Sequence, residues 1–317
     1  MSVGSGWGRH AARVFATDPR TELCGLVGRG SARTEALAAE LAVPVFHDLS
    51  EAVAAVRPQI ASVAAHHSSN VALVDQLLSA DCHVLCSHPV APTAKEVQQL
   101  AERSKAKGLV VATDYTLRLQ PGFTALVNAR ADGGALLRLS LESPGSTSVM
   151  AVDLALALAG PVELVRAARR YPPEVGARVR ERSRAFAPTF LLEHHSGCVT
   201  VISPVPHADP AAAYRVVMSL ERCRVEAGLP AGRVDSLAYR GSGLVDRSAL
   251  LPAAPSMTPD SLYGAAMQNL VGLFVSACLG QKTPHAGFEE EARTCEVWNA
   301  LRRSAHHDAD VRIEGQL

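Results

Sequence analysis

Residues 22–113 alternate short apolar stretches with amphipathic ones, and this alternation constrains the fold more than any other feature of the chain. The apolar stretches predict strands at Glu22–Val27, Val43–Phe46, Gln59–Ala65, Cys82–Cys86 and Leu109–Thr113. The segments between them predict helices at Ser31–Leu41, Leu49–Val56, Val71–Ala80 and Thr93–Ala106. Strands that are apolar along their whole length need cover on both faces, which a parallel sheet between two layers of helices provides. The N-terminal part therefore predicts a doubly wound, Rossmann-type α/β domain.

After about Tyr115 the pattern changes to longer strand-like stretches separated by turn residues. These are Ala135–Glu142, Thr189–His194, Val199–Ile202, Ala213–Ser219, Arg222–Ala227 and Val234–Tyr239. They favour an α/β domain with a large, mostly antiparallel open sheet. Helices are expected at Val149–Leu158, Pro259–Leu279 and Phe288–Ser304. We expect residues 1–116 to bind a dinucleotide and residues 117–317 to bind substrate and oligomerise, and the final helices can also pack back on the first domain.

The balance of charge argues against several classes of partner. Lys and Arg total 31, Asp and Glu total 31, and aromatic residues make up only 4% of the chain. A neutral chain without a basic block lacks the electrostatic footprint of a nucleic-acid binder and of a membrane-surface protein. The 7 scattered cysteines form no C-x-x-C pair, which indicates reduced thiols in a cytoplasmic protein. No metal site is expected, because the Cys and His side chains of residues 82–88 alternate between the two faces of one strand.

A glycine-rich segment near the N-terminus predicts the dinucleotide site. The candidates for cofactor binding there are Gly4, Gly6, Trp7 and Gly8. Small residues before a helix let the backbone approach a pyrophosphate, although Arg9 replaces the third glycine of G-x-G-x-x-G. The alternative is a flexible Gly/Ser stretch. A first strand normally has about five residues, so this one is either abbreviated or begins upstream of Met1.

The end of the second strand bears on the choice of cofactor. An NAD site usually has an Asp or Glu there to bind the ribose 2′-hydroxyl. This chain has Arg29, Ser31 and Arg33 instead. Guanidinium groups suit the doubly charged 2′-phosphate of NADP, so we expect NADPH to be the cofactor. The alternative is an arginine-bearing loop that faces solvent.

Polar residues follow the next two strands, where a doubly wound sheet forms its ligand crevice. His66 and Ser68 follow one strand, and His88 and Pro89 follow the other. We expect all four to contact the cofactor, and His88 to be catalytic as well, because imidazole exchanges protons near neutral pH. The alternatives are a helix cap at Ser68 and a purely structural turn at His88.

Two further residues are candidates for substrate contact. Tyr115 follows the last strand of the first domain, and its phenol can donate a proton. We favour Tyr115 as the proton donor with His88 orienting the substrate, although a packing role at the hinge is the alternative. Asp153 is the one carboxylate in an apolar helix, so it either faces the substrate or pairs with a neighbour.

Together these segments resemble the glucose–fructose oxidoreductase and inositol dehydrogenase (Gfo/Idh/MocA) family, and within it the thiazolinyl imine reductases of siderophore biosynthesis. The resemblance is carried by Gly4–Arg9, Leu26–Arg33, His83–Val90, Thr113–Tyr115 and Val152–Leu154. Most of the family has Glu-Lys-Pro, with a lysine that takes part in proton transfer, where this chain has Ser87-His88-Pro89. The imine reductases likewise have His-Pro.

The resemblance implies a reaction and a partner. Hydride would pass from NADPH to the C=N carbon of a thiazoline held as a thioester on the carrier domain of a nonribosomal peptide synthetase. Tyr115 or His88 would protonate the ring nitrogen, which gives a thiazolidine. A homodimer through the sheet of the second domain is also expected. Two alternatives stay open: a sugar or cyclitol dehydrogenase on the same scaffold, and a non-catalytic NADP-binding sensor or scaffold.

Overall fold

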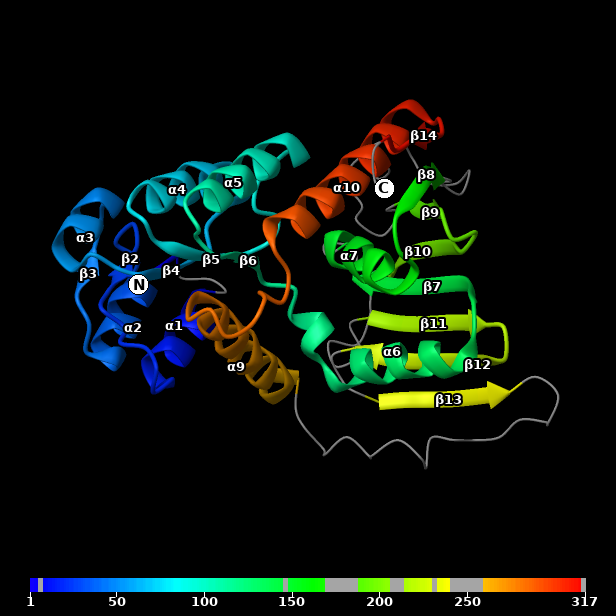
Figure 1. The fold of residues 1–317 in the computed structure, drawn as a ribbon, viewed down its shortest axis with the longest axis horizontal. Coiled ribbons are helices and arrows are strands. Elements are labelled where there is room, and N and C mark those ends of the chain that lie inside the picture. Colours follow the sequence, from blue (N-terminus) through cyan, green and yellow to red (C-terminus); the bar gives the residue numbers. More distant parts are fainter. Residues whose placement is uncertain are drawn as a thin grey trace. The chain divides into compact units, whose positions relative to one another are not determined.

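A computed structural model describes residues 1–4, 8–144, 148–168, 188–205, 214–229, 233–239 and 259–314. The chain divides into two units (Figure 1). Unit 1 comprises Met1–Thr116 and Gly264–Cys295, and unit 2 comprises Leu117–Tyr263 and Glu296–Leu317. The C-terminal helices α9 (Pro259–Cys278) and α10 (Phe288–His307) are therefore divided between the units rather than belonging wholly to the second.

The sheet of unit 1 confirms the expected doubly wound fold. It has six strands in the order β3-β2-β1-β4-β5-β6, and every neighbouring pair is parallel. The strands are β1 (Ser2–Val3), β2 (Leu26–Val27), β3 (Val45–Phe46), β4 (Ile60–Val63), β5 (His83–Cys86) and β6 (Val111–Thr113). Although β1 has only two residues, it pairs with both β2 and β4 at the centre of the sheet. The strand order therefore reverses beside β1, where such folds bind their ligands.

Helices cover both faces of this sheet, as continuously apolar strands require. They are α1 (Gly8–Thr17), α2 (Ala32–Leu41), α3 (Leu49–Val56), α4 (His67–Ser79) and α5 (Ala94–Ala106). In Figure 1, α4 and α5 lie on one side of the sheet, and α1 and α2 on the other. Local sequence sets where several of these helices begin. Asp48 accepts backbone N–H bonds at the start of α3, and Thr93 with Glu96 forms a capping box at the start of α5.

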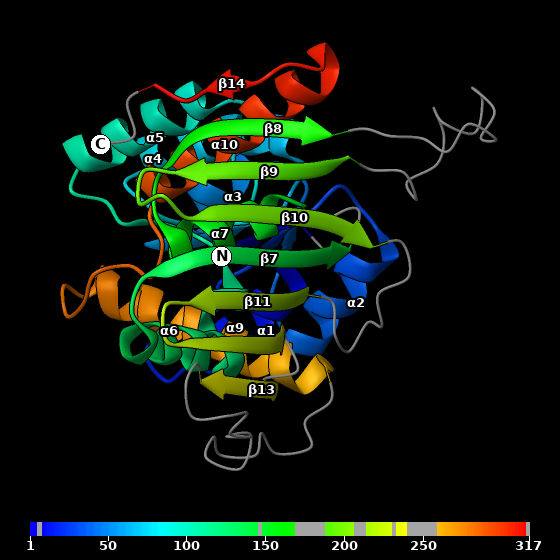
Figure 2. The same cartoon turned by 90° about the vertical axis from the view of Figure 1, so that its right-hand side faces the viewer.

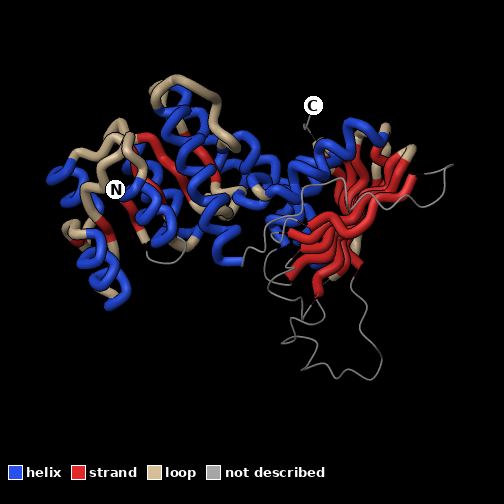
Figure 3. The backbone as a smooth tube through the Cα atoms, turned by 90° about the horizontal axis from the view of Figure 1, so that it is seen from below, coloured by secondary structure: helices blue, strands red, loops and turns tan. Residues whose placement is uncertain are grey.

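Unit 2 contains the large, mostly antiparallel sheet that the sequence predicts. Its eight strands have the order β13-β12-β11-β7-β10-β9-β8-β14, and only the β7–β10 pair is parallel. The strands are β7 (Leu136–Pro144), β8 (Val162–Ala168), β9 (Thr189–His194), β10 (Val199–Val205), β11 (Tyr214–Leu220), β12 (Cys223–Leu229), β13 (Arg233–Tyr239) and β14 (Val311–Arg312). Figure 2 faces the side of this sheet that lies away from α6 (Pro121–Gly133) and α7 (Ser148–Ala159), and Figure 3 shows the strands as one block.

One buried histidine ties the sheet of unit 2 to the end of α7. His194 is 3% exposed, and its Nδ1 lies 2.8 Å from the carbonyl oxygen of Gly160. Because a carbonyl only accepts, Nδ1 carries the proton and Nε2 accepts from the Thr200 hydroxyl, also at 2.8 Å. Burial lowers the pKa of His194 below its ordinary value, because a charged imidazolium loses its hydration there.

The lowered pKa of His194 makes the stability of unit 2 sensitive to acid. The unfolded chain takes up the histidine proton below about pH 6.5, before the folded chain does. The stabilising contribution is therefore present above that pH and is lost as the pH falls through the lowered pKa. We expect the free energy of unfolding of wild type to fall more steeply than that of His194→Gln between about pH 7 and pH 5. Urea unfolding followed by circular dichroism tests this, and parallel curves for the two proteins would contradict it.

Among the residues that the structure describes, no helix combines the length and the apolar character needed to cross a bilayer.

Candidate functional site

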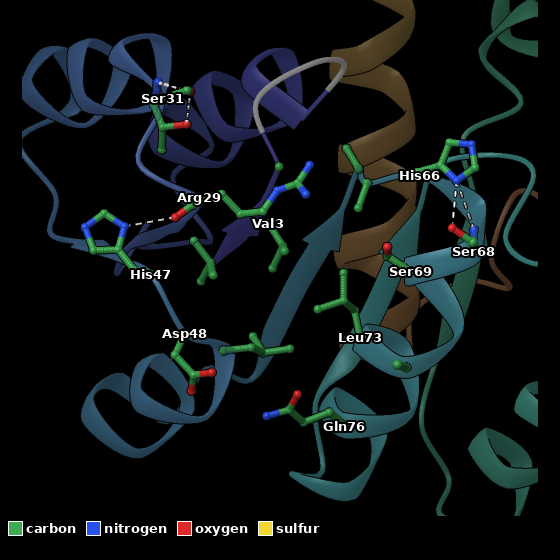
Figure 4. A pocket seen from close by; sticks show the side chains of 18 residues that line it. Val3, Arg29, Ser31, His47, Asp48, His66, Ser68, Ser69, Leu73 and Gln76 are labelled. Atoms are coloured by element: carbon green, nitrogen blue, oxygen red, sulfur yellow. Dashed lines mark hydrogen bonds between the residues drawn. The ribbon is translucent and has the colours of Figure 1, made fainter.

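A cavity of about 790 Å³ lies at the carboxyl ends of β1, β2 and β4 in unit 1 (Figure 4). Residues of α2, α3 and α4 complete its wall. The predicted residues that line it are Gly4, Arg29, Ser31, His66 and Ser68. Residues that the sequence analysis did not single out also line it, among them Thr34, His47, Asp48, Leu73 and Gln76. The cavity therefore lies at the carboxyl edge of the sheet, where folds of this topology bind their ligands.

Gly4 lets the end of β1 come close to β4. Its φ is +93°, and a Cβ at this position would lie 2.2 Å from the carbonyl oxygen of Ala64. Only glycine fits both the backbone conformation and the space. Gly8 begins α1, and a Cβ there would lie 3.1 Å from the Cβ of Ala64. Gly6 and Trp7 lie outside the described residues.

Only one of the two arginines predicted to bind a 2′-phosphate lines this cavity. Arg29 does, whereas Arg33 lines a separate cavity of about 240 Å³ together with Arg9 and Arg13. The reason is helix geometry: α2 begins at Ala32, and successive helical residues point about 100° apart. Arg33 therefore does not line the cavity that Arg29 lines, and its contact with a cofactor stays a prediction.

The hydroxyl of Ser31 has a local structural role. It caps α2 by accepting the backbone N–H of Thr34 at 3.2 Å, and it lies 2.9 Å from the Thr34 hydroxyl. Ser31 therefore contributes both to the cavity wall and to the start of the helix.

An acidic residue that follows the third strand also lines the cavity. Asp48 lines it, and the backbone N–H groups of Glu51 and Ser50 donate to its carboxylate at 3.0 and 2.7 Å. These bonds hold the pKa of Asp48 below its ordinary value, so the group is ionised at neutral pH. The sequence analysis missed Asp48 because it considered an acid only after the second strand.

The segment after β4 is fastened to the segment after β5. His66 and Ser68 stand at the start of α4, where His66 Nδ1 lies 2.8 Å from the Ser68 hydroxyl. The buried side chain of Asn70 accepts the Ala65 N–H at 3.3 Å and donates to the Pro89 carbonyl at 3.4 Å. Asn70 therefore joins the cavity wall to the turn that contains His88.

A histidine–aspartate pair stands at the ends of β5 and β6. Cys86 and Thr113 are partners in the register of these strands, so the residues that follow them meet at the same edge. Asp114 Oδ1 accepts the backbone N–H of His88 at 2.7 Å and lies 2.5 Å from its Nδ1. A carboxylate accepts from Nδ1–H, so the second ring nitrogen, Nε2, is the one that can exchange a proton with a bound molecule. The His88 side chain is 20% exposed and that of Asp114 only 2%.

Tyr115, favoured above as the proton donor, is completely buried. Its hydroxyl donates a short hydrogen bond to the carboxylate of Glu291, and its ring centroid lies 5.5 Å from that of His88. His285 Nε2 lies 3.3 Å from its carbonyl oxygen. The structure thus places Tyr115 beside His88 but directs its hydroxyl at a protein carboxylate. The His88–Pro89 peptide bond is cis.

Glu291 is a member of this cluster that the sequence analysis missed. It lies on α10 within a row of three glutamates, which gives no local signal that the third is fully buried. Burial raises the pKa of Glu291 above its ordinary value, while the bond from Tyr115 lowers it in part.

Asp153 belongs to unit 2 and is fully buried on α7. Both of its carboxylate oxygens accept from the guanidinium of Arg118, with Arg118 Nε to Oδ2 at 3.0 Å. A buried charge requires such a partner. Of the two roles expected for this carboxylate, the structure shows the pairing with a neighbour, and this pairing accounts for Asp153 without a substrate.

Within the described part of the chain, no group of three or more His, Cys, Asp or Glu side chains is arranged to hold a metal ion.

A six-stranded parallel sheet whose glycine-lined cavity sits at the point of reversed strand order defines a dinucleotide-binding domain of the Rossmann type. Residues 3–115 match the Gfo/Idh/MocA family, described as an oxidoreductase family with an NAD-binding Rossmann fold. This match covers only the N-terminal part of the chain, and it agrees there with the family-level resemblance seen in the sequence. No protein of curated function matches the chain in sequence.

Solved structures with the same fold extend over the whole chain. An oxidoreductase from Agrobacterium radiobacter, in complex with NAD+, L-tartaric acid and magnesium, has a TM-score of 0.82 at 13% identity and covers 100% of this chain and 98% of its own. A UDP-N-acetylglucosamine 3-dehydrogenase from Acidithiobacillus ferrooxidans has a TM-score of 0.75 at 19% identity and covers 96% of both chains. A myo-inositol 2-dehydrogenase from Lactobacillus plantarum has a TM-score of 0.78 at 15% identity and covers 99% of this chain and 98% of its own. At sequence identities this low, the similarity shows that the fold is shared and nothing about the function.

Proposed function

We propose that the protein is a nicotinamide dinucleotide-dependent oxidoreductase that interconverts a hydroxyl and a carbonyl group on a sugar- or cyclitol-like substrate. The observation that carries this proposal is the His88–Asp114 pair at the same sheet edge as the glycine-lined cavity. Ser87 donates its backbone N–H to Val63 at 2.8 Å, so the turn that bears His88 directly adjoins the cavity wall after β4. The names of the structural neighbours, an inositol and a UDP-sugar dehydrogenase, support this substrate class.

The residues of the cavity fit a dinucleotide. Gly4 lines the cavity and lets the end of β1 pack closely against Ala64, and Arg29 offers a cation near the end of β2. When bound, the dinucleotide supplies the nicotinamide ring that accepts or gives the hydride.

His88 performs the proton transfer in this proposal. In the oxidative direction, Nε2 takes the proton of the substrate hydroxyl as the hydride leaves the carbon. In the reductive direction, it returns a proton to the carbonyl oxygen. Asp114 keeps the proton of the neutral ring on Nδ1 and compensates the charge of the imidazolium.

Turnover with defined substrates tests the function. The purified protein is incubated with NAD+ or NADP+ and with myo-inositol or UDP-N-acetylglucosamine, and reduced nicotinamide is followed by its near-ultraviolet absorbance. We expect turnover with at least one polyol or sugar. Cofactor binding without turnover on a broad panel of such compounds would overturn the proposed substrate class.

Imine reduction is the second candidate function, and Ser87-His88-Pro89 in place of Glu-Lys-Pro favours it. An imine nitrogen is more basic than a ketone oxygen, so a histidine can replace the lysine as the proton source. The substrate would be a thiazoline thioester on a carrier domain, reduced by NADPH to a thiazolidine. A gain of two hydrogens by mass spectrometry, with the carrier-loaded thiazolinyl thioester and NADPH, would favour this reaction over polyol oxidation.

We expect NADPH to bind at least about tenfold more tightly than NADH, a difference of about 1.4 kcal/mol. The reason is the guanidinium of Arg29 in the cavity, which can pair with a 2′-phosphate. Arg29→Ala should weaken NADPH binding more than NADH binding, and fluorescence titration measures both. Arg33→Ala is the matched control, because Arg33 lines the other cavity, and it should leave the ratio unchanged. Equal affinities in wild type would refute the preference.

A further inference from the structure

We propose that Glu291 is a positioning residue of the proton-exchange site, where it holds in place the two chain segments that flank His88. The expected effect of Glu291 on catalysis rests on the proposed function. The contacts that support its positioning role do not depend on that function.

The Glu291 carboxylate joins three segments of unit 1 that are far apart in the sequence. Its Oε1 accepts the backbone N–H of Val90 at 2.9 Å, across 201 residues. Its Oε2 accepts the hydroxyl of Tyr115, across 176 residues. The thiol of Cys295, one turn further along α10, donates to Oε1 at 3.4 Å. One carboxylate thus links the first turns of α10 to the ends of both β5 and β6.

Both of the linked segments carry part of the His88–Asp114 pair. Val90 follows His88 by two residues, so its anchored N–H limits movement of the cis turn that holds the imidazole. Tyr115 directly follows Asp114, and its ring lies at 30° to that of His88 with a centroid separation of 5.5 Å. Displacing either segment would change the distance from His88 to Asp114 or to a bound substrate. Errors of about 1 Å in such positions can reduce a rate by about 10²-fold.

The energetic balance argues against Glu291 serving as simple core packing. The side chain is fully buried, and a buried carboxyl costs more free energy than an apolar side chain of similar size. Three donors, from Val90, Tyr115 and Cys295, compensate part of that cost. The titratable groups that act on this carboxyl are Tyr115, His88 and Cys295, and His88 in turn is bonded to Asp114. The raised pKa of Glu291 agrees with this enclosure.

Nitrogen NMR of the His88 ring tests the proposal independently of any substrate. Protein with ¹⁵N-labelled histidine is titrated as wild type, Glu291→Gln and Glu291→Ala, and His88→Asn assigns the signal. Glu289→Gln is the matched control, because Glu289 lies on the same turn of α10 and is exposed.

We expect wild type and Glu289→Gln to share the Nδ1–H tautomer and one titration midpoint. Glu291→Gln should keep the tautomer, because its amide oxygen can still accept from Val90, but its titration midpoint should shift, because the coupling between the carboxyl and the His88 ring is lost. Glu291→Ala should mix the tautomers. Unchanged tautomer and midpoint in both Glu291 variants, with only a lower Tm, would overturn the proposal. If Glu291→Ala does not fold, the midpoint of Glu291→Gln decides.

Turnover then separates positioning from binding. With the substrate that the proposed function identifies, Glu291→Gln should lower kcat by about 10- to 100-fold and leave KM and cofactor affinity nearly unchanged. An unchanged kcat would also overturn the proposal. If wild type turns over none of the tested compounds, the proposed function fails, while the NMR result still decides the role of Glu291.

Discussion

His88→Asn should lower kcat by about 10²- to 10⁴-fold, the usual contribution of one positioned general acid or base. Cofactor affinity should change little, because the cavity is lined by other residues. Asp114→Asn should cause a loss of similar order, because an amide can favour the wrong tautomer of the imidazole. Steady-state kinetics with the substrate found above measures both variants, and fluorescence titration measures the cofactor affinity.

Tyr115→Phe separates the two candidate proton donors. If His88 exchanges the proton, this variant loses the bond to Glu291 but keeps its ring beside His88, so its loss of activity should not exceed the about 10- to 100-fold expected for Glu291→Gln. If Tyr115→Phe abolishes activity while His88→Asn retains it, the phenol is the acid and the roles are reversed. Retention of activity by both variants would remove both residues from proton transfer.

Gly4→Ala should abolish dinucleotide binding under ordinary conditions, with an increase in Kd of at least about 100-fold, or about 2.7 kcal/mol. The added Cβ would lie 2.2 Å from the Ala64 carbonyl oxygen, a backbone atom that can move only if β1 and β4 separate. The positive φ adds strain of about 1–3 kcal/mol, so Tm should also fall.

Gly108→Ala is the matched control for Gly4→Ala. Gly108 also has a positive φ, of +66°, but a Cβ there would meet no atom within 4 Å. It should therefore lose stability through backbone strain alone and bind the cofactor like wild type. Thermal unfolding measures the loss of stability in both variants, and fluorescence titration measures their cofactor affinity. A loss of affinity in Gly4→Ala alone is then caused by the contact with Ala64 and not by backbone strain. Wild-type affinity in Gly4→Ala would show that the end of β1 does not form the cofactor site.

Local sequence determined most of the elements. The helix at Leu49–Val56 and the strand at Thr189–His194 have the predicted bounds, because a cap and clear turn residues delimit them. Three elements of unit 2 were missed, namely α6, β8 and the two-residue strand β14. Helix α6 begins with Pro121-Gly122, a pair typical of turns, and β8 follows Gly160-Pro161 directly after an apolar helix. The parallel pairing of β7 with β10 also has no local signal, since it joins strands separated by about fifty residues of chain.

For the site, the sequence by itself determined which residues stand at the ends of the strands, because a buried parallel strand leaves a clear apolar pattern that stops where polar residues begin. It thereby placed Gly4, His66 and His88 at the carboxyl edge of the sheet. Tertiary structure alone decided their partners: Asp114 beside His88, Glu291 from 201 residues beyond Val90, and Arg33 turned to another cavity. These contacts depend on the order of strands in the sheet and on which face of a helix is buried. Neither is encoded within a few residues of the positions concerned.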